Sequence, residues 1–456
     1  MKLRPFERIA LLSGIVLFLF LGVLALVSYQ VGLPKPQVIF ENGAEGLIGG
    51  RGPVEIRFQQ DMDRLSLESR LSFEPVWAGK WQWTDERTLR FLPANTLGEG
   101  AEITLHLAEG ARSRDGRVLR QPFDIELRVR PASVVFLNDP FSSPELMRID
   151  PANGEKSLLT ESDGRVFDFS VSPDGEKVVY SRVNLRDGSD LVLINRYGRE
   201  EKLLVECGEF ACIEPAWTPD SRYVAYTRYE SGLTASLVGG VGKVYVVDVE
   251  TGQSNPLFNN PGLYGSLPVF SPDGNQVSFY DFNQQAIRLV NLLDGSSSIV
   301  PSRVAGRGSW SPDGSVLLVA DWDGEGTIPP VTLFQLNLVN RQVSRFFEES
   351  FSVLDVGLPE WSPDGSKLVI GIQRESRQEG KQLWLFDKDG NPVLQITDNP
   401  QFNYSSYHWS PDGKKVVFQQ VNLGQPDDSP RILIWYPAEE RIELLHENGS
   451  FPQWMP

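Results

Sequence analysis

Apolar and polar residues alternate in the first large segment of the chain after its N-terminal region. Between residues 37 and 131, short runs such as "PVEIRFQQ" and "AEITLHLAEG" place apolar residues at every second position. A period of two predicts strands that bury one face and expose the other. Several such strands separated by turns predict a β-sandwich over residues 37–131.

From residue 132 to residue 456 the apolar runs are nearly continuous, and a short turn sequence recurs before them. The turn occurs six times, in "VSPDGEKVVYS", "WTPDSRYVAYT", "FSPDGNQVSFY", "WSPDGSVLLVA", "WSPDGSKLVIGI" and "HWSPDGKKVVFQQ". A spacing of about 40 to 53 residues is typical of four-stranded propeller blades. Strands covered on both faces are continuously apolar, as expected when blades stack face to face. The predicted fold class for residues 37–456 is therefore all-β: a β-sandwich followed by a β-propeller.

The residues of the repeated turn have a mechanical explanation. Proline suits the first corner of a turn, Asp bonds the backbone ahead of it, and Gly accepts a positive φ. We expect the tryptophans before the turns to wedge between neighbouring blades; they are Trp217, Trp310, Trp361 and Trp409. Each turn supplies one carboxylate, whereas calcium needs about six to eight oxygens, so no metal site is assigned.

The two ends of the repeat region predict how the propeller closes. The C-terminal "SFPQWMP" matches "GLPEWSP", a segment that forms an innermost strand in another repeat. Residues 133–160 read as three strands that lack an innermost strand of their own. The C-terminal strand therefore completes the first blade, which removes open edges and gives seven blades. Six blades is the alternative, and it leaves these terminal pieces unexplained.

The repeats resemble those of TolB-type propellers, which also occur in prolyl oligopeptidases. The resemblance covers residues 132–456 and implies an architecture more than a function. Residues 37–131 resemble the bacterial Ig-like domain of S-layer proteins, which implies a spacer or adhesion module. The matching positions are Phe58, Met62, Asp63, Phe91, Pro93, Leu97, Gly100 and Gly116, with Ile103 in place of the usual tyrosine.

The N-terminus predicts a membrane anchor. Residues 9–31 contain no charge and are long enough to cross a bilayer as a helix. Lys2, Arg4 and Arg8 precede this run, so residues 1–8 should form a cytoplasmic tail and the bulk of the chain should be extracytoplasmic. A cleaved signal peptide is the alternative, although its apolar region is normally shorter.

Net charge and cysteine content bear on the binding partners and on a disulfide. The formal net charge of −17 argues against non-specific binding of nucleic acid, which needs a basic surface. In an oxidising compartment the close pair Cys207 and Cys212 predicts a disulfide; two buried or free thiols are the alternative. The sequence suggests no cofactor.

Function is predicted from the loops that enter the innermost strands, because no catalytic motif is found. A G-x-S-x-G nucleophile elbow is missing from the sequence, and no catalytic residue is assigned. The loops gather aromatic residues on one face of the ring, which favours a surface for a protein, peptide or glycan partner. These candidates are Phe210, Phe258, Tyr264, Phe351, Phe402, Tyr404 and Tyr407. Packing beneath the loops is the alternative for each of them. The chain is thus read as a membrane-anchored binding or scaffold protein, with a hydrolase or lyase acting in the propeller channel as the alternative.

Overall fold

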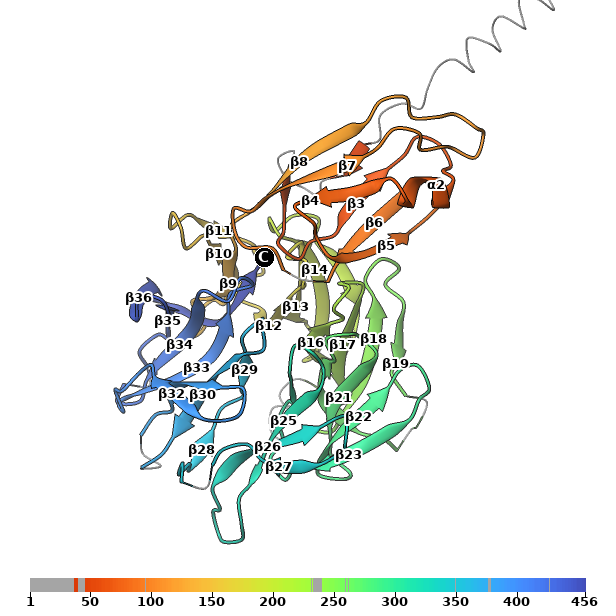
Figure 1. Cartoon of the computed structure of the whole chain (residues 1–456). Helices are drawn as coiled ribbons and strands as arrows, with labels where there is room; N and C mark the ends of the chain where they lie inside the picture. Colours follow the sequence, from red (N-terminus) through yellow and green to blue (C-terminus); the bar gives the residue numbers. More distant parts are fainter. Residues whose placement is uncertain are drawn as a thin grey trace, which may run out of the picture. The chain divides into compact units, whose positions relative to one another are not determined.

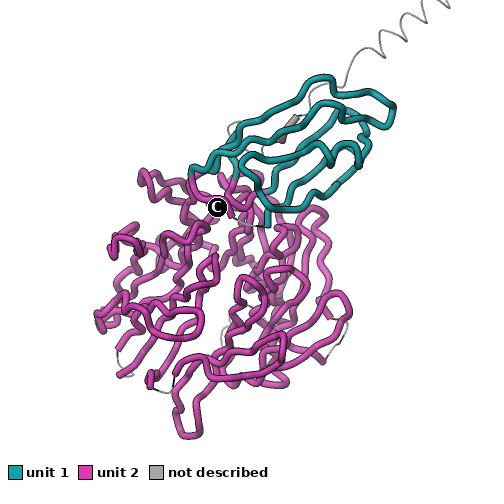
Figure 2. Tube along the Cα trace, in the orientation of Figure 1, with its two compact units in different colours: residues 1–48, 53–95, 100–129 teal, residues 49–52, 96–99, 130–456 magenta. Residues whose placement is uncertain are grey.

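The computed structural model describes residues 37–39, 46–94, 96–230, 232, 240–258, 260, 262–348, 350–375, 379–425 and 427–456. The described residues form an all-β structure with one short helix, α2 (Arg64–Glu68), and the chain divides into two compact units (Figures 1 and 2). Unit 1 comprises residues 1–48, 53–95 and 100–129, and unit 2 comprises residues 49–52, 96–99 and 130–456. The predicted anchor over residues 9–31 lies outside the described residues. Within the described residues, no helix has the length and apolar character needed to cross a membrane.

Unit 1 contains two four-stranded sheets that pack face to face. One sheet has the order β1 (Gln37–Ile39), β3 (Val54–Arg57), β6 (Thr88–Pro93), β5 (Gly79–Trp83), and the other β2 (Leu47–Ile48), β8 (Phe123–Val129), β7 (Glu102–Leu107), β4 (Leu71–Glu74). Phe73 of one sheet contacts Trp81 and Phe91 of the other, with ring centroids 5.7 and 4.6 Å apart. Asp63, at the predicted loop, caps α2 by accepting the Ser66 N–H at 3.1 Å.

The strands of unit 2 pair into seven groups of four, here called quartets 1 to 7. Quartet 1 contains β37 (Gly449–Met455), β9 (Ser133–Asn138), β10 (Glu145–Ile149) and β11 (Lys156–Leu158); quartet 2, β12 (Val166–Val171), β13 (Lys177–Val183), β14 (Ser189–Asn195) and β15 (Lys202–Val205); quartet 3, β16 (Ala211–Trp217), β17 (Tyr223–Tyr229), β18 (Gly242–Asp248) and β19 (Ser254–Pro256). Quartet 4 contains β20 (Gly265–Phe270), β21 (Gln276–Asp281), β22 (Ala286–Asn291) and β23 (Ser297–Pro301); quartet 5, β24 (Ser309–Trp310), β25 (Val316–Trp322), β26 (Val331–Asn337) and β27 (Val343–Arg345). Quartet 6 has a first strand in two pieces, β28 (Asp355–Val356) and β29 (Glu360–Trp361), then β30 (Lys367–Gln373), β31 (Gln382–Asp387) and β32 (Pro392–Gln395); quartet 7 contains β33 (Phe402–Trp409), β34 (Val416–Asn422), β35 (Arg431–Tyr436) and β36 (Arg441–His446).

First strands of neighbouring quartets contact one another in six of the seven pairs given for the described residues, and the end of the chain completes quartet 1. Contacts link β37 to β12, β12 to β16, β16 to β20, β24 to β29, β29 to β33, and β33 back to β37. The C-terminal strand β37 pairs antiparallel with β9, with Trp454 opposite Val134, and the C-terminus lies beside β9 (Figure 1). The pairing predicted for the C-terminal strand is therefore confirmed. Trp454 packs with Phe136 and Ile434, which joins the apolar cores of quartets 7 and 1.

The repeated turns share one hydrogen-bonding scheme. In all six, the Ser or Thr hydroxyl donates to the Asp carboxylate at 2.5 to 2.7 Å and accepts the backbone N–H of the residue five positions later. The turn glycines have φ between 70° and 72°. Ser221 replaces the glycine in quartet 3 and is held at φ 59°, a strained value for a residue with a side chain. Its hydroxyl accepts the N–H of Asp174 at 3.2 Å, which ties quartets 2 and 3 together.

Tryptophan and proline side chains bridge consecutive quartets. The indole N–H of Trp454 donates to the His408 carbonyl at 2.9 Å, and that of Trp217 to the Ser170 carbonyl at 3.0 Å. A Cβ atom added at Gly413 would lie 3.5 Å from the proline ring of Pro363, so the turn glycine of one quartet rests on the turn proline of the previous one. The same contact recurs at Gly274, Gly314 and Gly365 with Pro219, Pro272 and Pro312. Trp217, Trp310 and Trp409 each donate to the preceding quartet and so lie between quartets, as the sequence predicts.

We predict that the Trp454 indole contributes to stability through its hydrogen bond. Trp454→Phe leaves the His408 carbonyl without its donor, which should cost about 1–2 kcal/mol of unfolding free energy. Trp361→Phe is the matched control, because among the described residues its indole nitrogen has no hydrogen-bond partner. Denaturant unfolding of both variants checks this, and equal losses in the two would contradict it.

A pH dependence is also expected at the contact between quartets 7 and 1. His446 Nδ1 lies 3.1 Å from Lys156 Nζ, and Nε2 lies 2.9 Å from Asn138 Oδ1, an arrangement that suits a neutral ring accepting from lysine. Burial and the Lys156 charge lower the pKa of His446, while Glu447 opposes the shift. The folded state favours the neutral ring. The contribution of His446 to the unfolding free energy is therefore complete above about pH 6.5, the pKa in the unfolded chain, and is lost as the pH falls toward the lower pKa of the folded state.

His446→Gln should therefore weaken the fall in melting temperature between neutral and mildly acidic pH. The wild type is the reference. Thermal unfolding of both proteins at several pH values measures the slope. An unchanged slope in the His446 variant would show that this histidine does not carry the effect.

Candidate functional site

Three of the seven predicted aromatic residues lie in the core. Phe351, Tyr404 and Tyr407 are buried, with relative exposures of 7%, 5% and 6%. Tyr407 fills space left by two glycines of quartet 6: its hydroxyl accepts the Gly371 N–H at 2.8 Å and would lie 2.6 Å from a Cβ atom on Gly357. Burial raises the pKa of the Tyr407 phenol. For these three residues the expectation of an exposed face is corrected, because they pack between strands instead.

The other four predicted aromatic residues are half-buried and pack against neighbours. Phe210 lies under the Arg228 guanidinium, 4.5 Å from the ring centroid, and Tyr264 lies 5.1 Å from Lys243 Nζ. Phe258 contacts Phe279 at 5.4 Å between centroids, and Phe402 joins the core around Tyr404. They support the loops from beneath and do not form a continuous exposed aromatic surface.

Exposed apolar side chains lie at the end of the quartets where the predicted aromatic loops are, but in other connections. Because the strands are antiparallel, the start of each first strand and the connection between the second and third strands share one end, here called the loop end. Phe141, Leu185 and Ile328 in these connections are 63%, 96% and 68% exposed. Val241, Trp322 and Leu423 also expose large parts of their side chains there. The sequence signal was an apolar residue inside an Asp-, Gly- or Pro-rich turn, as in "NLRDG".

The residues three positions before the motif tryptophan, in or next to the first strands, differ in character between quartets. These are Asp168, Glu214, Leu267, Arg307, Leu358, Ser406 and Phe451. Phe451 and Leu358 are 50% and 45% exposed. Asp168 accepts the Glu214 N–H at 2.7 Å, and Glu214 in turn accepts the Leu267 N–H at 2.7 Å. Burial raises the pKa of Asp168, while Arg307 opposes that shift. Each of the two carboxylates thus accepts a backbone N–H of the next quartet, so their role here is structural.

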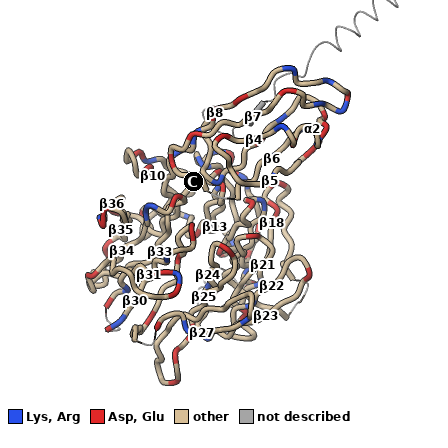
Figure 3. Tube along the Cα trace, in the orientation of Figure 1, with Lys and Arg blue, Asp and Glu red and all other residues tan. Residues whose placement is uncertain are grey.

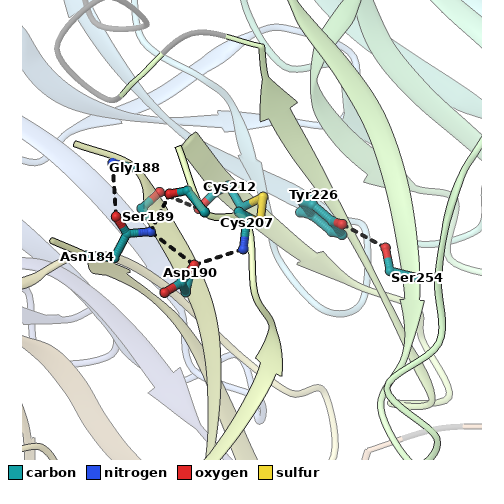
Figure 4. The surroundings of a disulfide bond; sticks show 9 residues. Asn184, Gly188, Ser189, Asp190, Cys207, Cys212, Tyr226 and Ser254 are labelled. Atoms are coloured by element: carbon teal, nitrogen blue, oxygen red, sulfur yellow. Dashed lines mark hydrogen bonds between the residues drawn. A yellow bond between two sulfur atoms is a disulfide. The ribbon is translucent and has the colours of Figure 1, made fainter. Parts of the chain in front are cut away.

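The predicted disulfide between Cys207 and Cys212 is formed in the structure, in the connection between quartets 2 and 3 (Figure 4). Its loop is bound to the start of β14: Ser189 Oγ donates to the Cys212 carbonyl at 2.9 Å, and the Cys207 N–H donates to Asp190 at 2.8 Å. A parallel bridge between Ser189 and Ala211 joins β14 to β16, so these two quartets form one eight-stranded sheet. The loop therefore fastens two quartets together at the loop end.

Two sequence relatives are similar to part of this chain. The chain is 24% identical over 276 residues to Tol-Pal system protein TolB of Francisella tularensis subsp. mediasiatica (strain FSC147), a match that covers 59% of this chain and 59% of that protein. It is 28% identical over 224 residues to the "Uncharacterized peptidase YuxL" of Bacillus subtilis (strain 168), covering 47% of this chain and 31% of that protein. The chain thus spans less than two thirds of the length of these relatives. No protein-family model matches the chain.

Solved structures show the same architecture. A prolyl endopeptidase aligns with a TM-score of 0.51 at 13% identity, over 83% of this chain and 50% of that chain. Prolyl oligopeptidase B from Galerina marginata aligns with a TM-score of 0.50 at 13% identity, over 71% and 52%. Unit 2 is a TolB-like β-propeller. The peptidase likeness concerns the fold alone, because identity is low and only about half of each peptidase is matched.

We predict that the disulfide stabilises the TolB-like propeller. Replacing both Cys207 and Cys212 with Ser should lower the unfolding free energy by about 2 kcal/mol, the chain-entropy value for so short a loop. Reducing the wild-type protein should reproduce the loss, and thermal unfolding measures both. A non-reduced mass that showed two free thiols would contradict the pairing.

Proposed function

We propose that the chain is an extracytoplasmic binding or scaffold protein that holds a protein partner on the loop end of its propeller. The observation that carries the proposal is the set of exposed large apolar side chains in five of the connections at that end. Phe141, Leu185 and Ile328 expose most of their apolar surface to water there, which is unfavourable unless another molecule covers it. Exposed apolar residues gathered on one face are typical of protein interaction sites.

The proposal includes a closed ring in which the seven quartets are the blades. Contacts between first strands support it for six pairs of quartets, the hydrogen bond from Trp310 to Ser278 supports it for quartets 4 and 5, and the pairing of β37 with β9 closes quartet 1. In a closed ring the loop ends of all blades face the same way, so residues as distant in sequence as Phe141 and Leu423 belong to one surface. A partner of protein size could then contact several blades at once.

An extracytoplasmic location is supported by the disulfide, since such bonds persist in oxidising compartments. Relatives that carry the name Tol-Pal system protein TolB support a function in binding other proteins. We further propose that residues 9–31 anchor the chain in the membrane and that unit 1 is an Ig-like spacer. Both rest on the sequence pattern and on the two packed sheets of unit 1.

We predict that partner capture depends on the exposed residues of the loop end. The full-length chain would be cross-linked in native membranes and the captured proteins identified by mass spectrometry. Combining Phe141→Ser, Leu185→Ser and Leu423→Ser should reduce capture about tenfold or more, because apolar anchors dominate interface energies. Their exposure means that the melting temperature should change little.

The matched control removes three exposed apolar residues from outer strands, with Val343→Ser, Val393→Ser and Leu444→Ser. This variant should capture the partner as the wild type does. Equal loss in both variants, or no loss in the loop-end variant, would refute the proposal. Hydrolase activity of the purified chain that survives the loop-end changes would favour the enzyme alternative.

A further inference from the structure

An open groove of about 740 Å³ lies between quartets 3 and 4, where their Ser/Thr-Pro-Asp turns meet. These turns are at the end of the strands opposite the loop end, so the groove is separate from the proposed partner surface. Its volume is within the range of about 300–1,000 Å³ that is usual for ligand sites. The floor is apolar and includes Val246, Leu257 and Phe270.

The groove wall carries three carboxylates from three different turns: Asp220, Asp248 and Asp273. Among the described residues, its lining contains no lysine or arginine. Arg222 stands at the margin, 3.5 Å from Asp248, and its guanidinium also lies over the Tyr223 ring. Hydrogen bonding to the Thr251 N–H helps to lower the pKa of Asp248, so this carboxylate stays ionised at neutral pH.

The turns beside the groove lack a lysine that several other turns carry. In quartets 2, 6 and 7, the fifth residue after the turn Ser is a lysine, namely Lys177, Lys367 and Lys415. At the same position quartets 3, 4 and 5 have the uncharged residues Tyr223, Gln276 and Val316, and the basic residue of the quartet 3 turn is Arg222 at the margin of the groove. Acidic and basic residues are otherwise interspersed along unit 2 (Figure 3). The local charge therefore comes from the turn carboxylates themselves.

The arrangement matches an organic cation on an aliphatic stem better than a metal ion. In each carboxylate one oxygen accepts backbone N–H groups of its own turn, as Asp220 accepts the Arg222 N–H at 3.1 Å and Asp273 the Asn275 N–H at 3.0 Å. The second oxygen of Asp273 also accepts the side-chain N–H of Asn275 at 2.8 Å, and that of Asp248 lies 3.5 Å from Arg222. The part of the chain that the structure describes contains no group of three His, Cys, Asp or Glu residues that could hold a metal. A long aliphatic side chain can rest on an apolar floor while its charged end meets carboxylates at the wall.

We propose that this groove binds an extended peptide segment of a partner protein through a lysine or arginine side chain. The aliphatic stem lies on Phe270 and Leu257, and the cation lies among Asp220, Asp248 and Asp273. The exposed amides of Gln253 and Asn255 at the rim offer both donors and acceptors to the peptide backbone. Charge complementarity selects the basic residue, and the apolar floor selects its stem.

The test uses the full-length chain and a fluorescein-labelled peptide, Ala-Leu-Lys-Leu-Ala, in an anisotropy titration. Asp220→Asn combined with Asp273→Asn keeps the acceptor oxygens of both turns and removes two charges, so binding should weaken about tenfold or more. Asp313→Asn combined with Asp364→Asn is the matched control. These residues occupy the same motif position with the same turn hydrogen bonds, but they do not line the groove. The control should bind within about twofold of wild type.

A second measurement does not depend on any variant. A peptide with norleucine in place of lysine keeps the stem and loses the charge, and wild-type protein should bind it about tenfold more weakly, with less salt dependence. Equal affinity for the two peptides would overturn the proposal, as would an unchanged affinity in the groove variant. Self-association of the chain that competes with the peptide would assign the groove to a second copy and would also overturn it.

Discussion

The contact between one quartet and the next is the interaction on which the rest of unit 2 depends. Each quartet is apolar on both faces of its middle strands, so it cannot be stable in water alone. Two kinds of interaction repeat this contact in the propeller. Tryptophan indoles donate to the preceding quartet, as Trp409 does to the Glu360 carbonyl, and turn glycines stack on turn prolines. The chain begins quartet 1 with β9 and supplies its first strand only at β37, so the last contact is made between the two ends of the repeat region. Without that pairing the first strand of quartet 1 would be missing and β9 would present an unpaired edge.

The same constraint explains why so many acidic residues here serve architecture rather than chemistry. The aspartates of the repeated turns bind the serine hydroxyls and backbone N–H groups of their own turns, which keeps the reversal tight where two apolar strands meet. Asp168 and Glu214 each hold a backbone N–H of the following quartet. A cluster of carboxylates on the first strands therefore resembles a polar site in sequence, although its oxygens are engaged in fastening quartets. Surfaces that recognise other molecules have to come from residues outside this fixed pattern.

The repeat made much of the fold predictable from the sequence. The turn motif, the disulfide between Cys207 and Cys212, and the pairing of the C-terminal strand all depend on local spacing or on simple matching between copies, and all three are found. The aromatic residues were harder to place because their burial depends on other quartets. Tyr407 is buried because Gly357 and Gly371, far from it in sequence, leave room for its ring. Leu185 stays exposed because its connection projects beyond the strands, which no periodicity in the sequence encodes.

Departures from the repeat are thus the places where specific recognition can arise. Ser221 shows that a departure is tolerated when a contact between quartets compensates for it, since the strained φ is accompanied by the hydrogen bond from Asp174. Close to it, Tyr223 takes a position that is lysine in three other quartets, and it lines an open groove together with Asp220 and Asp273. Because the turn hydrogen bonds fix the carboxylates independently of any ligand, the groove is already organised before anything binds. A repeat that must conserve its contacts can therefore acquire a distinct binding surface by changing only the residues beside them.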